Sequence, residues 1–254
     1  MNSELKGRVY IVTGGSRGFG LAISKTLVAN GARVGLTGRS QQNLDVARAE
    51  LGEKNCFTAV ADAADSAATR AAFAAIKAHF GQLDGLVNNA GLARPNKVEA
   101  LVEEEVVLQV NTNFLGTVFS CQAAIPLLRD SDNPRIINIS SASAFHFDEM
   151  GHLSIYAASK AAVERFSRDL AMELYDDEIG VSCIRPGHAD TEFAVGWDME
   201  ATMAGFEAWR AFGSFTREGM TVDDIAGAVA YTLAQPRGVA VDMMEIRPNR
   251  RIPK

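Results

Sequence analysis

The sequence lacks the features that mark a secreted, metal-binding or membrane protein. Its three cysteines, Cys56, Cys121 and Cys183, are odd in number and far apart, which argues against a disulfide framework or a zinc site. We expect reduced, packed thiols and no metal ion. The N-terminus has no signal-peptide apolar stretch, and no apolar run is long enough to cross a bilayer. We therefore expect a cytoplasmic protein without a membrane segment.

Basic charge is also scarce. The 25 lysines and arginines are outnumbered by 31 aspartates and glutamates, and the formal net charge is −6. This balance argues against general binding of nucleic acid or of an anionic membrane surface. Hydrophobic residues make up 47% and charged residues 22% of the 254 positions, as in an ordinary globular protein. No linker or repeat interrupts the chain, so we expect one domain over residues 1–254.

What the chain does have is a glycine-rich turn directly after its first apolar run. Residues 8–13 predict a strand, and Gly14, Gly15, Gly18 and Gly20 follow before a helical periodicity begins. A dinucleotide diphosphate requires this arrangement, because glycines let the backbone approach and the helix N-terminus faces the anion. The order Thr-Gly-x-x-x-Gly-x-Gly differs from the commoner Gly-x-Gly-x-x-Gly. A tight connection without ligand is the alternative, but the position after the first strand favours binding.

The second predicted strand, residues 32–37, ends in Gly38, Arg39 and Ser40. A site selective for NAD usually has an acidic residue here to accept the ribose hydroxyls, and this chain has none. Arg39 at the strand end and Arg17 in the glycine turn suit a ribose 2′-phosphate, because arginine binds phosphate through a bidentate fork. Two solvated surface arginines are the alternative. The pattern favours NADP(H) over NAD(H).

Strand and helix signals continue to alternate along the chain. Strands are predicted at residues 56–61, 85–91 and 135–141, with helices at 67–80 and 98–128. Such alternation indicates right-handed β-α-β units and a parallel sheet with helices on both faces. Ligands of this architecture bind at the carboxyl ends of the strands. The loops expected to share that rim are those at Gly14, Arg39, Asp62, Asn88 and Ser141.

Tyr156 and Lys160 are four residues apart at the beginning of a predicted helix that runs through Leu174. Residues at this spacing lie on the same face, one turn apart. A lysine ammonium near a tyrosine favours the phenolate and lowers the pKa of the phenol, which makes it a useful acid or base near neutrality. Alone, the pair is a weak signal, since a surface tyrosine beside a lysine has the same spacing. The nucleotide-binding features upstream favour the catalytic interpretation.

Four motifs in order make the chain resemble the short-chain dehydrogenase/reductase family. They are residues 13–20, Asn88–Gly91, Ser141 and Tyr156-x-x-x-Lys160, and the similarity runs over nearly the whole chain. The resemblance implies an α/β fold, a single-domain Rossmann-type doubly wound parallel sheet of about seven strands with helices on both faces. It also implies an NADP-dependent oxidoreductase that transfers a hydride between nicotinamide C4 and a small carbonyl or secondary alcohol substrate.

The resemblance also assigns catalytic roles. Tyr156 would protonate the carbonyl oxygen in reduction or act as the base in oxidation. Lys160 would hold the nicotinamide ribose and lower the pKa of the tyrosine. Ser141 would hydrogen-bond the substrate oxygen, and Asn113 would hold a water in a proton relay. Asn111 competes for that last role, but the family's asparagine lies three residues before a glycine, which selects Asn113.

The same resemblance implies the positions that would bind the cofactor. Asp62 would contact the adenine amino group, residues 89–91 would line the adenosine side, and Thr191 would lie near the carboxamide. The full set of implied positions is Gly14, Ser16, Arg17, Gly18, Phe19, Gly20, Arg39, Asp62, Ala63, Asn89, Ala90, Gly91, Tyr156, Lys160, Pro186, Gly187, Ala189 and Thr191.

The catalytic serine is open to two choices. The family's usual interval of thirteen residues before Tyr156 leads to Ser143, whereas Ser141 matches the strand-end motif and lies fifteen residues away. We favour Ser141, because residues 144–153 form a loop in which an insertion is easily accommodated.

The segment after Pro186-Gly187 is the one that covers the substrate in relatives. Residues 192–219 hold both tryptophans together with several phenylalanines and methionines. Such a segment would exclude water from hydride transfer, and packing as two amphipathic helices on the core or another subunit is the alternative. The helices of residues 98–128 and of Tyr156 resemble those that form dimer contacts in relatives, so we expect a homodimer or homotetramer.

Two further functions stay open at this point. A nucleotide-binding sensor or scaffold could keep the fold without the chemistry, although such proteins typically lose the tyrosine or the lysine. A 3-oxoacyl-(acyl-carrier) reductase would keep the chemistry but act on a carrier-linked substrate. The aromatic segment and the unusual ending at residues 243–248 count against that second alternative.

Overall fold

A computed structural model describes residues 3–146, 151–189, 194, 196–211 and 219–249 of the chain. At its centre is a seven-stranded parallel sheet in the order β3-β2-β1-β4-β5-β6-β7. This arrangement confirms the predicted Rossmann-type doubly wound sheet. The strands are β1 (Val9–Thr13), β2 (Arg33–Gly38), β3 (Cys56–Val60), β4 (Gly85–Asn88), β5 (Arg135–Ile139), β6 (Gly180–Pro186) and β7 (Met243–Ile246).

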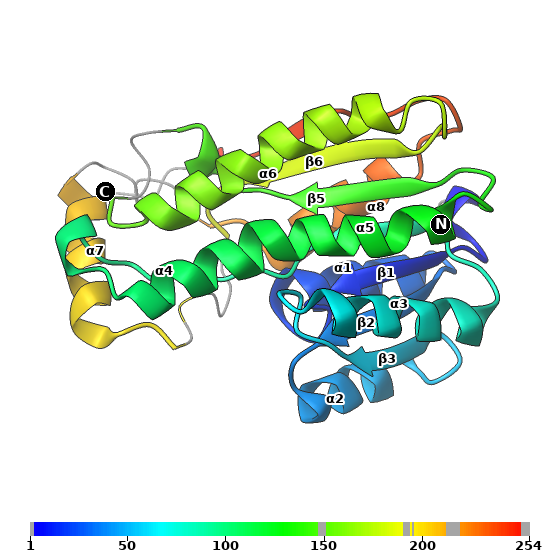
Figure 1. The fold of residues 1–254 in the computed structure, drawn as a ribbon, viewed down its shortest axis with the longest axis horizontal. Helices are drawn as coiled ribbons and strands as arrows, with labels where there is room; N and C mark the ends of the chain where they lie inside the picture. Colours follow the sequence, from blue (N-terminus) through cyan, green and yellow to red (C-terminus); the bar gives the residue numbers. More distant parts are fainter. Residues whose placement is uncertain (1–2, 147–150, 190–193, 195, 212–218, 250–254) are drawn as a thin grey trace.

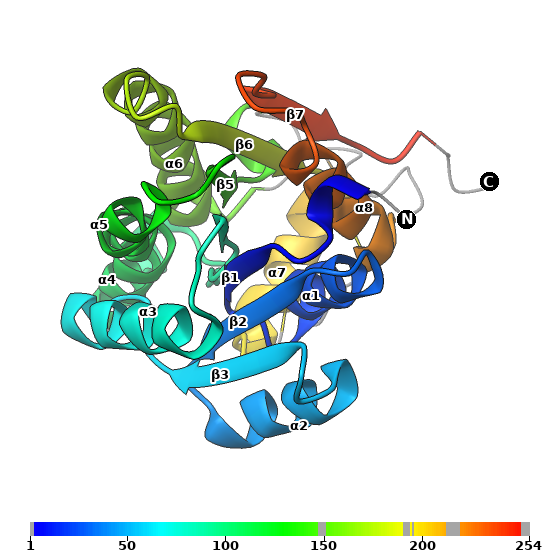
Figure 2. The ribbon, with the colours of Figure 1, turned by 90° about the vertical axis from the view of Figure 1, so that its right-hand side faces the viewer.

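Helices cover both faces of the sheet (Figure 2). One layer packs its apolar side chains on β1, β2 and the carboxyl halves of the central strands, and consists of α1 (Gly18–Ala29), α2 (Gln41–Leu51) and α8 (Val222–Leu233). The opposite layer consists of α3 (Ser66–Phe80), α5 (Gly116–Leu128) and α6 (Ser154–Glu173). Because the sheet is buried on both faces, every residue of β1 and β4 is buried, which explains their near-continuous apolar runs.

Short polar side chains fix where several helices begin. The Ser40 hydroxyl accepts a hydrogen bond from the Asn43 amide at the start of α2, and one Asp65 oxygen accepts from two amides at the start of α3. Thr221 forms a reciprocal capping box with Asp224 before α8. These bonds satisfy amides that have no partner inside the helix, so each helix begins directly after its strand-to-helix loop.

The predicted long helix at residues 98–128 is interrupted. Residues 98–100 form an isolated turn of 3₁₀ helix, and α4 (Glu103–Val110) begins only after an extended residue at Val102. Three glutamates in the first turn of α4 complement its dipole. A π-helical turn, Asn111–Leu115, then joins α4 to α5. The prediction of one continuous helix was therefore wrong at its start, and Asn113 lies in the middle of the π turn.

The three cysteines are buried free thiols, and burial raises the pKa of each to about 12. The expectation of packed thiols is confirmed. Among the described residues, no helix combines the length and the apolar character that crossing a bilayer requires.

Candidate active site

The carboxyl ends of the parallel strands meet at one rim of the sheet, at the left of Figure 1. The α7 helix (Met199–Ala211) lies beyond the strand ends at this rim. The sheet order turns at β1, which pairs with β2 on one side and β4 on the other. Such a switch point separates the loops that leave the two neighbouring strands, and it is the place where ligands bind in this architecture.

The glycine turn after β1 has the conformation that its residues predict. Gly14 has a positive φ of 62°, which favours glycine. A Cβ on Gly20 would lie 2.2 Å from the Gly14 carbonyl oxygen, so no larger residue fits where α1 crosses the turn. Arg17 precedes α1 and places no side-chain cap on it. The first amides of α1 are therefore left for another acceptor.

The loop after β4 is bound directly to this turn. The Thr13 hydroxyl accepts hydrogen bonds from the amides of Asn89 and Ala90, at 3.0 and 3.1 Å. The Asn89 side chain donates in return to the carbonyl oxygens of Thr13 and Gly14, at 3.0 and 3.2 Å. The two loops that flank the switch point are thus held at a fixed separation, as two walls of one crevice require.

The end of β2 lies beside the glycine turn. The Gly15 amide donates to the Thr37 carbonyl oxygen at 3.2 Å, and a Cβ on Gly38 would lie 3.6 Å from the Ser16 hydroxyl. Arg17 and Arg39 are both exposed, and neither guanidinium group forms an ion pair with a residue in the described part of the chain. The structure therefore brings together the serine and the two arginines that the sequence singled out.

Tyr156 and Ser141 meet at the centre of the rim. The Ser141 hydroxyl lies close enough to the Tyr156 phenol to lower its pKa, and it accepts a hydrogen bond from the Ser143 hydroxyl at 2.9 Å and from the Ser143 amide at 3.3 Å. A polar chain thus runs from Ser143 through Ser141 to Tyr156. Of the two serines considered, Ser141 is the one that faces the tyrosine, and Ser143 supports it.

Lys160 lies one turn further along α6 and is almost completely buried. Its ammonium donates to the Ile139 carbonyl oxygen at 2.8 Å and lies 5.9 Å from the centroid of the Tyr156 ring. A Cβ on Gly91 would come within 3.3 Å of the Lys160 ammonium and 3.2 Å of the Asn113 amide oxygen. These three residues therefore converge on one point of the rim.

Asn113 is held from two sides. Its amide nitrogen donates to the Leu92 carbonyl oxygen at 2.9 Å and to the Ser159 hydroxyl at 3.0 Å, while its amide oxygen accepts from the Leu92 amide at 2.8 Å. The Asn113 carbonyl oxygen accepts from the Thr117 hydroxyl at 2.9 Å. The π turn therefore aims Asn113 at the loop after β4, where it fixes the backbone that leads into the crevice.

The ionisation of the pair differs from the sequence-based expectation. Burial raises the pKa of the Tyr156 phenol to about 12, and the hydrogen bond from Ser141 only partly opposes this shift. Burial also lowers the pKa of the Lys160 ammonium to about 8. The expected lowering of the tyrosine pKa by the lysine was therefore wrong, because desolvation disfavours the charged form of both groups.

Other predicted cofactor positions lie on the same rim. Asp62 follows β3, and its carboxylate accepts a hydrogen bond from the Ala64 amide at 2.9 Å. The Gly187 amide, after β6, donates to the Ile246 carbonyl oxygen at 2.7 Å. Ala189 forms a parallel bridge with Met220. Thr191 lies outside the described residues.

The α7 helix packs against the tyrosine. Trp209 is 3% exposed and forms a cluster with Ala93, Leu153 and Tyr156, and its indole N–H donates to the Gly151 carbonyl oxygen. Trp197 and Phe206 lie edge-on to the Trp209 ring. Of the aromatic residues predicted in this segment, Phe193, Phe212 and Phe215 lie outside the described part of the chain.

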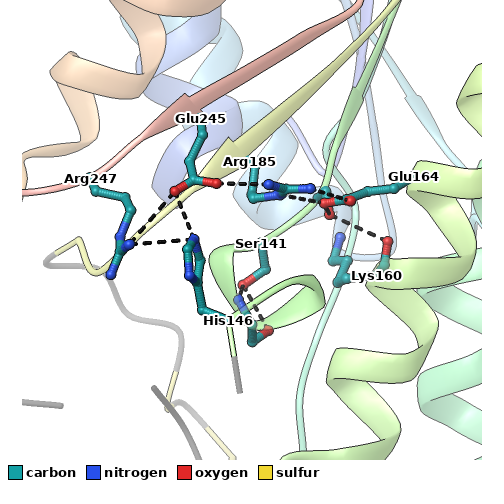
Figure 3. A network of polar contacts seen from close by, with 9 residues as sticks. Ser141, His146, Lys160, Glu164, Arg185, Glu245 and Arg247 are labelled. Atoms are coloured by element: carbon teal, nitrogen blue, oxygen red, sulfur yellow. Dashed lines mark hydrogen bonds and ion pairs between the residues drawn. The ribbon is translucent and has the colours of Figure 1, made fainter. Parts of the chain in front are cut away.

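Sequence reasoning missed an ionic network beside the loop of residues 140–146, which carries Ser141 (Figure 3). Arg185 in β6 is 7% exposed and forms ion pairs with Glu164 of α6 at 2.6 Å and with Glu245 of β7 at 2.7 Å. The signal that could have revealed it is a charged residue in the otherwise apolar run 181–186, because a buried charge requires a partner. The identity of the partners could not be read from the sequence.

Comparison with known proteins assigns the chain to a family. Residues 8–201 match the family described as short chain dehydrogenase. The chain belongs to this family. It is therefore an oxidoreductase of the short-chain dehydrogenase/reductase type, and an uncharacterized oxidoreductase of Staphylococcus saprophyticus is 32% identical to it over 248 residues, covering 96% of this chain and 99% of that protein.

Solved structures of other proteins share the fold over nearly the whole chain. A blue fluorescent protein from a metagenomic library, in complex with NADPH, has a TM-score of 0.83 and 31% identity, covering 98% of both chains. A 3-ketoacyl-(acyl-carrier-protein) reductase from Brucella melitensis, complexed with NADH, has a TM-score of 0.83 and 26% identity, covering 98% of this chain and all of that one (100%).

Proposed function

We propose that this short-chain dehydrogenase is an NADP(H)-dependent reductase of ketones or aldehydes that can also run in the direction of alcohol oxidation. The observation that carries the proposal is the polar chain from Ser143 through Ser141 to Tyr156, with Lys160 one turn away on α6. This chain lies at the rim where the glycine turn and the loop after β4 meet, so a carbonyl group near the tyrosine would also be near a bound cofactor.

The rim fits a dinucleotide. The close crossing at Gly20, where a Cβ would meet the Gly14 carbonyl at 2.2 Å, leaves a backbone cradle at the uncapped start of α1. Amides at a helix N-terminus bind a diphosphate through hydrogen bonds and the helix dipole. Asp62 and residues 89–91 would hold the adenosine side, and Lys160 would hold the nicotinamide ribose. Pro186, Gly187 and Ala189 would line the nicotinamide side.

The preference for NADP(H) rests on charge at the end of β2. Arg17 and Arg39 are exposed and have no acidic partner in the described part of the chain, and Ser16 lies beside Gly38. Two guanidinium groups and a hydroxyl suit a 2′-phosphate, whereas selectivity for a ribose diol would call for a carboxylate. Both nicotinamide cofactors occur in the solved relatives, so the preference is argued from this chain's residues.

The chemistry follows from the protonation states. When bound, a nicotinamide cofactor supplies or accepts the hydride at the substrate carbon. Because the Tyr156 phenol is protonated at neutral pH, it can donate its proton to the oxygen that becomes an alkoxide in reduction. The Ser141 hydroxyl donates a hydrogen bond to the same oxygen and stabilises its developing charge. The buried Lys160 ammonium adds a positive charge beside the phenolate that remains.

The α7 helix would complete the site by excluding water. Trp209 shields one side of Tyr156 together with Leu153 and Ala93, and an apolar wall strengthens the electrostatic interactions next to it. We propose that this wall contacts an apolar portion of the substrate.

The proposed assembly is a homodimer or homotetramer. Apolar side chains are exposed on α4 at Val107 and at the end of α6 at Met172, with exposed fractions of 48% and 75%. Exposed apolar surface on neighbouring helices favours association. Light scattering on the purified protein tests this, and a monomer at micromolar concentration would contradict it.

The experiment that tests the function follows nicotinamide absorbance with a panel of ketones, aldehydes, 3-oxo esters and 3-oxoacyl thioesters. We expect turnover with NADPH on at least one small carbonyl compound and slower turnover with NADH. Tight binding of NADPH without turnover on any member of the panel would instead support the sensor alternative.

Cofactor preference has its own test. Arg39→Ala and Arg17→Ala should each weaken NADPH binding by about tenfold or more, since each removes a charge-assisted contact to phosphate. Binding of NADH should change little. An equal loss for both cofactors would contradict a role in 2′-phosphate recognition.

A further inference from the structure

The ionic network around Arg185 has no role in the proton chemistry described above. Its centre is a fork of two carboxylates on one guanidinium group. Arg185 Nε and Nη2 donate to the two oxygens of Glu164 at 2.8 and 2.6 Å, and Arg185 Nη1 donates to Glu245 Oε2 at 2.7 Å. Three charged side chains from α6, β6 and β7 therefore meet close to Ser141 and Lys160 (Figure 3).

Glu245 connects this fork to the loop of residues 140–146. Its second oxygen, Oε1, lies 2.8 Å from His146 Nε2. A carboxylate only accepts hydrogen bonds, so we assign the proton of the His146 ring to Nε2, which donates a hydrogen bond to Glu245. Arg247 Nη1 lies 3.4 Å from the same nitrogen and 3.8 Å from Glu245 Oε1. Because Nε2 is itself a donor, it cannot accept a hydrogen bond from Arg247, and the Glu245 carboxylate is the group that attracts Arg247.

His146 transmits that contact to Ser141 through a tight turn. The amides of Phe145 and His146 donate to the Ala142 carbonyl oxygen at 3.1 and 2.9 Å, and the Ala144 amide donates to the Ser141 carbonyl oxygen at 3.0 Å. The Phe145 ring also lies 4.7 Å from the Arg185 guanidinium carbon, a cation–π distance. The turn of residues 141–146 is thus tied to β6 and β7 by two adjacent side chains.

The other carboxylate of the fork ties the same network to α6. Glu164 lies one turn after Lys160, and its Oε1 accepts a hydrogen bond from the Ser140 hydroxyl at 2.8 Å. Ser140 directly precedes Ser141 and also lies 3.3 Å from the Lys160 carbonyl oxygen. The network therefore contacts both segments whose relative position decides the distance between Ser141 and Tyr156.

We propose that Glu245, in the last strand, is a positioning residue that holds the turn of residues 141–146, and hence the Ser141 hydroxyl, in register with Tyr156 by binding His146 and Arg185 at once. This inference rests on the proposed function, in which Ser141 and Tyr156 share the substrate oxygen. Glu245, which lies 99 residues after His146 in the sequence, would thus help to set the distance between Ser141 and Tyr156.

The central test is Glu245→Gln, which keeps the shape of the side chain. An amide offers one acceptor oxygen and opposes a donor with its own N–H group, so while His146 Nε2 remains a donor the substituted side chain can hold His146 or Arg185 but not both. We expect kcat for carbonyl reduction to fall about tenfold, the size of effect that a small misplacement of a reacting group produces. The dissociation constant of NADPH, measured by fluorescence titration without substrate, should stay within about twofold because the cofactor contacts are untouched.

The pH profile separates positioning from a general loss of structure. The hydrogen bond from Ser141 lowers the pKa of Tyr156, so a displaced Ser141 should move the apparent pKa of alcohol oxidation upward. Ser141→Ala should move it in the same direction. A variant that only reduces the fraction of folded enzyme would lower the rate without moving this pKa, because the folded molecules would keep Ser141 in place.

Two variants complete the design. Glu178→Gln breaks the exposed ion pair of Glu178 with Arg237, which lies near the amino end of β6, and should leave kcat unchanged. His146→Phe, which keeps a planar ring but has no N–H group to donate to Glu245, should reproduce the tenfold loss, and the double variant Glu245→Gln/His146→Phe should lose little more than either single variant, because the two residues act as a unit. If Glu245→Gln fails to fold, His146→Phe alone carries the test.

The outcomes are distinguishable from those of the proposed function. If the wild-type enzyme turns over a carbonyl substrate while Glu245→Gln and His146→Phe keep kcat within about twofold of the wild-type value and leave the pH profile unmoved, the positioning role is overturned. Fully additive losses in the double variant would also overturn it. If the wild-type protein itself shows no turnover with any substrate, the proposed function fails and the positioning role falls with it.

Discussion

Two buried arginines on neighbouring strands show how differently the two ends of the sheet use charge. Arg135 begins β5 at the amino edge and is 4% exposed, and Arg185 lies near the end of β6 at the catalytic rim and is 7% exposed. Arg135 donates to the carbonyl oxygens of residues 235, 236 and 239. Arg185 instead holds two carboxylates from two different elements.

The pKa shifts of the two guanidinium groups have opposite signs. Burial lowers the pKa of Arg135, whereas the hydrogen bonds from Arg185 to Glu164 and Glu245 raise its pKa despite burial. Carbonyl oxygens offer only dipoles, and carboxylates offer full charges. The amino edge thus uses its arginine to fasten one loop, and the catalytic rim uses its arginine to connect α6, β6 and β7.

The largest effect should come from breaking the rim network. Arg185→Met leaves the buried Glu164 carboxylate without its ionic partner, and we expect a loss of about 3–5 kcal/mol in the free energy of unfolding together with loss of activity. Urea denaturation and NADPH turnover measure the two. Replacing both partners, as in Arg185→Met/Glu164→Leu, should restore most of the stability but not the activity. Recovery of activity in that double variant would contradict a positioning role.

The matched change at the other end, Arg135→Met, should cost less. Its carbonyl partners lie in the loop 235–239, where most residues are exposed and water can replace the lost donors, so we expect a loss of about 1–2 kcal/mol. Activity per folded molecule should be unchanged. A loss of kcat in Arg135→Met that matches that of Arg185→Met would remove the distinction between the two ends.

Replacing the buried lysine of the rim should stabilise the protein. Lys160 has a pKa lowered to about 8 by burial, which means that keeping it charged below that pH destabilises the folded state. Lys160→Met should therefore raise the melting temperature at pH 7 while abolishing turnover. Between pH 8 and its unfolded value of 10.5, the wild-type protein should gain stability relative to the variant as the ammonium loses its proton. A lower melting temperature of Lys160→Met than of the wild type at pH 7 would contradict the claim that the buried ammonium destabilises the folded state.

The smallest effect concerns Glu245 in acid. Burial alone would raise its pKa, but the hydrogen bonds and charges of Arg185 and His146 outweigh burial and lower it. A lowered folded-state pKa contributes stability above the unfolded value, and this contribution is lost as the pH falls through the folded value. The difference in unfolding free energy between wild type and Glu245→Gln should thus be below about 1 kcal/mol at pH 7 and shrink in acid. If the difference in unfolding free energy grew as the pH fell, the pKa of Glu245 could not be lowered in the folded protein.

Local patterns predicted much of the rim. The glycine turn after β1, the lack of an acid after β2 and the spacing of Tyr156 and Lys160 are features of short segments, and each can be read from neighbouring residues. The alternation of strand and helix signals predicted the parallel sheet, and the resemblance to a family then supplied its seven strands and doubly wound order, which the structure confirms. The break at residues 98–102 was missed, because an extended residue at Val102 leaves no local signal in a run of helix-forming residues.

Contacts between distant segments could not be predicted. Glu245 and His146 are 99 positions apart, and nothing in either neighbourhood indicates the other. The pKa of Tyr156 was predicted in the wrong direction for a related reason. The sequence shows that a lysine is near, but the degree of burial, which dominates the shift, depends on Leu153, Trp209 and the rest of the fold.

The most direct test of the central claim compares the wild-type enzyme with Tyr156→Phe under single-turnover conditions, with NADPH and the best carbonyl substrate. Phenylalanine keeps the ring that packs on Trp209 and removes only the hydroxyl group, whose proton the mechanism uses. We predict unchanged NADPH binding and a fall in the rate of reduction of at least about 100-fold, as expected for loss of a general acid. A variant that reduces the substrate at the wild-type rate would contradict the account.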